Sequence, residues 1–303
     1  MDQFSFLMKN INALSGGNFL TLARTISLIE NEVEGYENFM AQLPFSSTPI
    51  IGITGAPGSG KSSLADALIG EIIKEKKKVG VICVDPSSPF NKGALLGDRI
   101  RMGEWYNHPD VFIRSLASKG SLGGLHPKII EITDVMKAAG FDYIIIETVG
   151  VGQSEVDIAA LADITIVVLV PEGGDIIQTM KAGVMEVADI FVINKFDRPD
   201  AESYYNNLMQ MLAPAFHNSA KEIPVIKTIA SQKKGIEELY NKIVTDEINP
   251  PSDKKANLIF EKAWSIIQSK RMRNINKEEL KRNLLEAISK PEFNLYRFAE
   301  KNP

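Results

Sequence analysis

One short stretch of the sequence combines glycine, lysine and serine at a spacing that suits phosphate binding. An apolar run, Ile50–Thr54, leads directly into it, and a helical pattern, Ser62–Lys76, follows. In a strand–loop–helix of this kind, backbone N–H groups and the positive end of the helix dipole bind phosphate oxygens, while the lysine adds a point charge. The serine hydroxyl is a ligand suited to Mg²⁺. We therefore expect nucleotide phosphates to bind at Gly55, Ala56, Pro57, Gly58, Ser59, Gly60, Lys61, Ser62 and Ser63.

A second motif indicates which base the nucleotide carries. Asn194, Lys195 and Asp197 follow the apolar run Ile190–Ile193. The carboxylate of Asp197 can accept hydrogen bonds from N1–H and the exocyclic amine of guanine, whereas adenine would leave it unpaired. Asn194 can tie the loop together, and the stem of Lys195 can cover the base. The same string could cap a solvated helix, but its place after a strand favours guanine.

The segment after the next apolar run offers further contacts with the base. Ile223–Lys227 is followed by Thr228, Ile229, Ala230 and Ser231. A backbone N–H there, that of Ala230, is placed to donate to guanine O6. We expect Ile229, Ala230 and Ser231 to line the base site.

Acidic residues end two other apolar runs. Asp85 follows Val79–Val84, and Glu147 ends Tyr143–Glu147. Carboxylates at the carboxyl ends of parallel strands point into the ligand crevice, so both can hold Mg²⁺ directly or through water. A helix cap or a surface charge is the weaker alternative. Asp98, in a glycine-flanked segment, could reach the metal when a γ-phosphate orders that segment.

The same glycine-flanked segment carries two arginines. Arg99 and Arg101 are candidates to neutralise charge in the transition state of phosphoryl transfer. An ordinary surface charge is an equal alternative for each of them. The predicted catalytic residues are Lys61, Asp98, Arg99, Arg101 and Glu147. Gln153, in the segment after Glu147, either orients a water molecule or has a structural role.

The elements that must position these residues form an alternating pattern. Most apolar runs are near-continuous in Val and Ile, which is typical of strands buried on both faces of a parallel sheet. We predict an α/β fold, a doubly wound, mainly parallel sheet covered by helices, of the P-loop NTPase type. The predicted parts are a helical N-terminal extension (1–47), the nucleotide-binding domain (48–249) and a helical C-terminal extension (250–303). The remaining predicted strands are Val111–Ser115 and Ile164–Val170, and the remaining helices are Pro127–Ala139, Ile176–Val187, Ala201–Leu212, Ile236–Val244, Lys254–Lys270 and Lys277–Ser289.

The composition of the chain argues against several kinds of partner and site. The 303 residues carry a formal net charge of −4, which gives no electrostatic footprint for nucleic acid or an anionic membrane. A single cysteine excludes a disulfide framework within the chain. One cysteine and three histidines are also too few and too scattered for a zinc site. No apolar stretch is long enough to span a membrane, and the N-terminus does not resemble a targeting peptide. We expect a cytoplasmic protein.

Together the motifs resemble those of the MeaB/ArgK family, the methylmalonyl-CoA mutase-associated GTPases. The resemblance covers roughly residues 10–245 and rests on GITGAPGSGKSSL, DPSSPFNKGALLGDRIRM, ETVGVGQSE and the segment from PEGGD to NKFD. It implies a chaperone that binds GTP or GDP, gates cofactor loading and protects an adenosylcobalamin-dependent acyl-CoA mutase. It also implies a homodimer formed through helical extensions, and a third switch at Pro171–Gly183 with Asp175 and Lys181. The implied Mg²⁺ ligands are Ser62, Asp85, Asp98 and Glu147.

The sequence departs from the family pattern in three places. Ile229 stands where the family has serine, so the backbone must serve the base there. Lys119 stands where the family has arginine and lacks bidentate geometry. The tail after Pro251 does not closely match the family's dimerisation arm.

Three other functions share the phosphate loop. A metal-delivery maturation GTPase would need His/Cys clusters, which the sequence lacks. A small-molecule kinase has no use for the guanine motif. A transport-linked ATPase conflicts with Asp197, which disfavours adenine.

Overall fold

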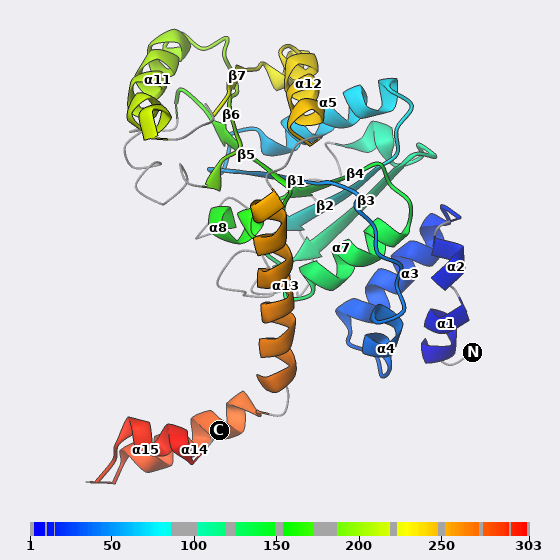
Figure 1. The fold of residues 1–303 in the computed structure, drawn as a ribbon, viewed down its shortest axis with the longest axis vertical. Helices are drawn as coiled ribbons and strands as arrows, with labels where there is room; N and C mark the ends of the chain where they lie inside the picture. The colour runs from blue at the N-terminus through cyan, green and yellow to red at the C-terminus, as the bar shows by residue number, and fades with distance from the viewer. Residues whose placement is uncertain are drawn as a thin grey trace. The chain divides into compact units, whose positions relative to one another are not determined.

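The structure is a computed structural model of the chain, shown in Figure 1. It describes residues 3–9, 11–14, 16–85, 102–118, 125–148, 154–172, 187–218, 223–247, 252–272, 275–290 and 292–301. The chain divides into two compact units, Met1–Lys255 and Ala256–Pro303. All of the nucleotide-binding motifs belong to the first unit.

A seven-stranded parallel sheet forms the centre of the first unit, with strand order β3-β2-β4-β1-β5-β6-β7. Every residue of β1 is buried, as are those of β4, β5 and β6, which agrees with the near-continuous apolar runs in the sequence. The predicted doubly wound fold is therefore confirmed. The strands are β1 Ile50–Gly55, β2 Val79–Asp85, β3 Val111–Ala117, β4 Tyr143–Glu147, β5 Ile164–Leu169, β6 Ile190–Ile193 and β7 Val225–Lys227.

Helices cover both faces of this sheet (Figure 1). On one face α5 (Lys61–Lys74) and α12 (Ile236–Glu247) pack on the strands and on each other. On the other face lie α7 (Ile129–Ala138), α8 (Ser154–Ala159) and α11 (Ala201–Asn218). Of two short 3₁₀ helices, η1 Gly103–Trp105 follows the segment that carries Arg99 and Arg101, and η2 Ala230–Gln232 contains Ala230 and Ser231.

The N-terminal helices share a core with the sheet. They are α1 Gln3–Lys9, α2 Ile11–Leu14, α3 Phe19–Glu30 and α4 Tyr36–Met40. Leu22, Ile26 and Phe39 are fully or almost fully buried in one cluster with Ile144 and Ile146 of β4. Polar contacts add to this packing, because Lys128 Nζ donates to Tyr36 Oη (2.8 Å) and pairs with Glu32 (2.7 Å). The N-terminal helices therefore belong to the same folded unit as the sheet.

Several elements differ from their predicted ranges by a few residues, among them α11 and β7. Helix α11 continues past Leu212, through Pro214, to Asn218. Strand β7 begins at Val225 instead of Ile223, since Pro224 has no N–H to contribute to the ladder. The predicted helix Ile176–Val187 lies outside the described residues except for its last position.

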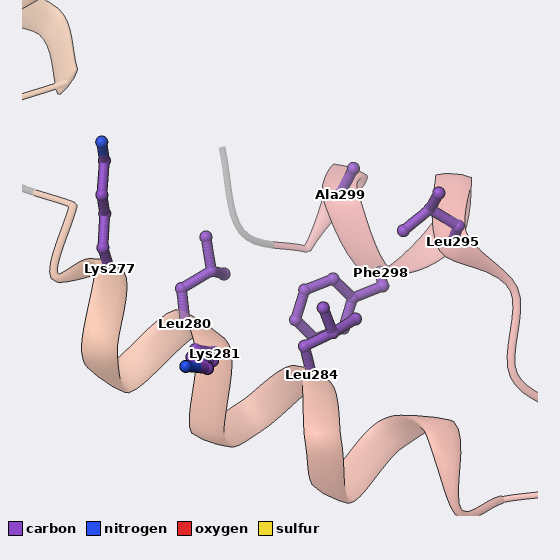
Figure 2. A pocket seen from close by; sticks show the side chains of 7 residues that line it. All are labelled: Lys277, Leu280, Lys281, Leu284, Leu295, Phe298 and Ala299. Atoms are coloured by element: carbon purple, nitrogen blue, oxygen red, sulfur yellow. The ribbon is translucent and has the colours of Figure 1, made fainter. Parts of the chain in front are cut away.

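The second unit is helical and carries many exposed apolar side chains. The division between units falls within α13 (Ser252–Met272), which is followed by α14 (Lys277–Ile288) and α15 (Leu295–Glu300). Phe260, Trp264 and Ile267 of α13 are about half exposed or more. Figure 2 shows an apolar groove between α14 and α15, lined by Lys277, Leu280, Lys281, Leu284, Leu295, Phe298 and Ala299. Among the described residues, no helix combines the length and the apolar character that crossing a membrane requires.

Candidate functional site

The phosphate loop connects β1 to α5, and two of its glycines are required by close contacts. Gly55 has φ +141°, and a Cβ there would lie 2.3 Å from the carbonyl oxygen of Val168 on β5. Gly60 has φ +91°, and a Cβ there would lie 2.3 Å from Asn194 Nδ2. Since only glycine fits both the backbone conformation and the space, these residues hold the loop close to the neighbouring strands.

The lysine of the loop lies over the loop's own backbone. Lys61 is almost fully buried, and its Nζ donates to the carbonyl oxygens of Gly55 (2.9 Å) and Ala56 (3.1 Å). The hydroxyl of Ser59 is fully buried and has no hydrogen-bond partner among the described residues. A cation and an unsatisfied buried hydroxyl at the N-terminus of α5 suit an anionic phosphate.

Ser62 and Glu147 come together at the carboxyl edge of the sheet. Ser62 Oγ donates to Glu147 Oε1 at 2.6 Å, and both side chains are buried. Glu147 lies beside Ile53 of β1 in the sheet register and beside Cys83 of β2. Asp85 ends β2 at the same edge, although its side chain is outside the description. Hydroxyl and carboxylate oxygens are the ligands that Mg²⁺ prefers, so the residues present fit this ion.

Several predicted site residues lie outside the described part of the chain. Among the described residues, no group of three or more His, Cys, Asp or Glu side chains could hold a metal. The residues that lie outside the description are Asp98, Arg99, Arg101, Lys119, Gln153, Asp175 and Lys181.

The chain that follows Arg101 is fixed to the phosphate-loop helix. Met102 is fully buried, and Trp105 of η1 donates from Nε1 to Asp66 Oδ1 of α5 at 2.8 Å. Burial raises the pKa of Asp66, and the negative charge of Glu104 raises it further. The hydrogen bond from Trp105 and the positive charge of Lys233 lower the pKa, but the net shift is upward. The ionised carboxylate is thus less stable in the folded protein than in the unfolded chain.

We expect Asp66→Asn to stabilise the protein at neutral pH. Because the pKa of Asp66 is raised in the folded state, the protein is more stable when Asp66 is protonated, and it loses this stability as the pH rises through the raised pKa. Asparagine keeps the acceptor for Trp105 and removes the charge, so the melting temperature should rise by about 1–2 °C at pH 7. The gain should shrink as the pH falls to about 4, where an ordinary aspartate carboxyl becomes protonated. Asp66→Ala, which leaves the indole N–H unpaired, should destabilise at both pH values; equal melting temperatures for Asp66→Asn and wild type at pH 7 would contradict this account.

Asn194 joins the base loop to the phosphate loop. It follows β6, is buried, and donates from Nδ2 to the carbonyl oxygen of Ser59 (2.9 Å). Its Oδ1 accepts from the backbone N–H of Ala230 (3.0 Å) and from Thr228 Oγ1 (3.2 Å). One amide side chain therefore fixes three loops relative to one another.

The segment after β7 takes part in this network. The Ala230 N–H, which we expected to donate to guanine O6, donates to Asn194. The Ile229 N–H donates to the carbonyl oxygen of Lys234 at 3.1 Å, and Ser231 is exposed. The segment therefore lies against the base loop, and its contact with guanine stays a prediction.

Asp197 is exposed at the rim of the base loop. The neighbouring Lys195 has φ +55° and pairs with Glu172, with 3.5 Å between Nζ and Oε2. Arg198 also pairs with Glu172, with 3.0 Å between Nε and Oε1. Glu172 lies in the segment 171–183, where the family resemblance implies a third switch, but no local pattern in the sequence links it to the base loop.

The fold and this site define the class of the protein as a P-loop NTPase with a guanine-type base loop. A sequence model of the family "Methylmalonyl Co-A mutase-associated GTPase MeaB" matches residues 22–280. The chain belongs to this family, which confirms the resemblance inferred from the motifs. It is accordingly a GTPase that binds guanine nucleotide and hydrolyses GTP.

Individual relatives agree with the family. A protein of Pyrococcus abyssi whose name proposes a GTPase is 47% identical, over 77% of this chain and 74% of its own length. The GTPase ArgK of Escherichia coli is 36% identical, over 78% of this chain and 75% of its own. A fused isobutyryl-CoA mutase of Geobacillus kaustophilus is 34% identical, over 96% of this chain but 28% of its own. The crystal structure of a LAO/AO transport system kinase superposes with a TM-score of 0.64 at 26% identity, covering 98% of this chain and 96% of that one.

Proposed function

We propose that this GTPase is a chaperone of an adenosylcobalamin-dependent acyl-CoA mutase of the methylmalonyl-CoA mutase type. On this proposal it gates the loading of the cofactor and protects the mutase from inactivation. The observation that carries the proposal is the relative named as a fused isobutyryl-CoA mutase, because nearly the whole of this chain aligns with only part of that protein. The family description, which names association with a mutase, supports it.

The chain's own residues account for nucleotide binding and charge stabilisation. Lys61 and the loop N–H groups bind the β- and γ-phosphates, and the Asp197 carboxylate accepts from N1–H and the exocyclic amine of guanine. Ser62 and Glu147, with Asp85 and Asp98, would hold Mg²⁺, which supplies positive charge near the transferred phosphoryl group when bound. Arg99 and Arg101 are the candidates for stabilising the transition state.

We further infer a homodimer formed through the helical extensions and a cytoplasmic location, with neither nucleic acid nor membrane as a partner. The exposed apolar side chains of the C-terminal helices support the homodimer, because exposed apolar patches mark interaction sites. The net charge of −4 supports the exclusion of nucleic acid and anionic membranes.

Steady-state phosphate release with and without a purified B12-dependent acyl-CoA mutase tests the proposed function. Phosphoryl transfer requires correctly placed positive charge, which is worth ~10³–10⁵ in rate. A partner that stabilises the competent arrangement of the chain raises its population and therefore the rate. We expect slow hydrolysis by the isolated GTPase and faster hydrolysis with the mutase.

A further inference from the structure

The carboxylate of Glu172 bridges the two ends of the turn that contains Asp197. Its Oε2 lies 3.5 Å from Lys195 Nζ, and its Oε1 lies 3.0 Å from Arg198 Nε. Glu172 comes from the chain that leaves β5, which neighbours β6 in the sheet. A second link joins the same two segments, because the Asn194 N–H donates to the carbonyl oxygen of Leu169 at 2.8 Å. The end of β5 therefore supports the base loop through both backbone and side chain.

The backbone of this turn is constrained at both ends. The Arg198 N–H donates to the Lys195 carbonyl oxygen at 3.0 Å, which closes the turn. The φ of +55° at Lys195 lies in the left-handed region that lysine seldom adopts. The Phe196 N–H donates to the Thr228 carbonyl oxygen at 3.0 Å. Because Asp197 is exposed and lies inside this turn, the direction of its carboxylate depends on the turn's conformation.

We propose that Glu172 is a positioning residue for guanine recognition. By holding Lys195 and Arg198 on one carboxylate, it fixes the turn so that Asp197 faces the base edge and the Lys195 stem covers the base. This inference rests on the assignment of the Asp197 loop to guanine. A single exposed ion pair contributes little, but a carboxylate shared by two cations across a turn restricts the conformations available to that turn. A base stacked on the Lys195 stem also shields the pair from water, which strengthens it.

The direction in which nucleotide affinity changes when Glu172 is replaced distinguishes a positioning role from a simple effect of its charge. Glu172 adds a negative charge near a ligand that carries negative phosphates. If only this charge mattered, its removal would tighten nucleotide binding. If Glu172 positions the turn, its removal weakens binding despite the lost repulsion.

The test compares GDP binding by the full chain and by Glu172→Gln, with a fluorescent GDP analogue in excess Mg²⁺. We expect Glu172→Gln to raise Kd about three- to tenfold, mainly through faster dissociation. Lys195→Met should have a similar effect, and the double variant should bind hardly more weakly than either single one, because both changes remove the same interaction. For GTP hydrolysis, KM should rise while kcat at saturating GTP stays unchanged.

Glu71→Gln is the matched control. It removes a carboxylate that pairs with an exposed lysine, Lys74, at 2.7 Å on α5, and it should leave nucleotide binding unchanged. Unchanged or tighter GDP binding by Glu172→Gln, or additive effects in the double variant, would overturn the positioning role of Glu172. Either result would leave the assignment of the Asp197 loop to guanine intact. Failure of the wild-type chain to bind guanine nucleotides would instead reject the guanine assignment, and this inference with it.

Discussion

Replacing Lys61 with alanine is expected to reduce GTP hydrolysis by about a hundredfold or more. The ammonium group donates to the carbonyl oxygens of Gly55 and Ala56, so it is held on the loop to which we assign the β- and γ-phosphates. Loss of a preorganised charge at a transferred phosphoryl group removes stabilisation that develops in the transition state. Single-turnover phosphate release at saturating GTP measures this loss apart from any loss of affinity.

Two further variants make that result specific. Lys74→Ala removes an exposed lysine from the same helix and should keep wild-type hydrolysis. Ser62→Ala removes the hydroxyl that donates to Glu147. This variant should lose hydrolysis, and the Mg²⁺ dependence of nucleotide binding should be the first property to be lost. Full activity in Lys61→Ala or Ser62→Ala would show that this loop is not the catalytic one.

Replacing Asp197 with asparagine is expected to change the preferred base from guanine to xanthine. Aspartate accepts from N1–H and from the exocyclic amine of guanine. Asparagine can accept from N1–H of xanthine and donate to its C2 carbonyl oxygen, but it opposes the guanine amine with an N–H. Donor–acceptor mismatches of this type cost about 1–3 kcal/mol each, so GTP affinity should fall by about ten- to a hundredfold while xanthosine triphosphate affinity rises. Competition titrations with the two nucleotides measure both changes.

Asp200→Asn is the control for this substitution. Asp200 is also exposed and lies just after the base loop, before α11, so the variant makes the same chemical change outside the expected base contact. It should leave the nucleotide preference unchanged. Unaltered GTP affinity in Asp197→Asn would refute the assignment of Asp197 to the guanine edge.

The sequence predicted most of the sheet and the two nucleotide motifs because both depend on local patterns. Strands β4 and β6 occupy their predicted ranges, since uninterrupted apolar runs bounded by polar residues mark buried parallel strands. The phosphate loop is a contiguous string, so the required backbone conformations at Gly55 and Gly60 are encoded beside the residues that use them.

Contacts between residues that are distant in the sequence, and that the fold brings together, could not be predicted in the same way. The pairs of Glu172 with Lys195 and Arg198 arise because the exits of β5 and β6 are adjacent, which no local pattern states. The hydrogen bond from the Ala230 N–H to Asn194 Oδ1 also joins residues that are far apart in the sequence. The burial of Phe39 and Leu22 against β4 likewise depends on tertiary packing; helical periodicity alone predicted only that the N-terminus is helical.

The most direct test of the central claim is steady-state phosphate release by this GTPase alone and with a B12-dependent acyl-CoA mutase from the same source. We expect slow hydrolysis by the isolated protein and a clear acceleration that saturates with mutase concentration. The acceleration should be absent in Lys61→Ala and reduced in Lys181→Ala, and by linkage GTP and GDP should change the affinity for the mutase to different extents. An isolated enzyme that is already fast and is accelerated by no such mutase would contradict the chaperone function.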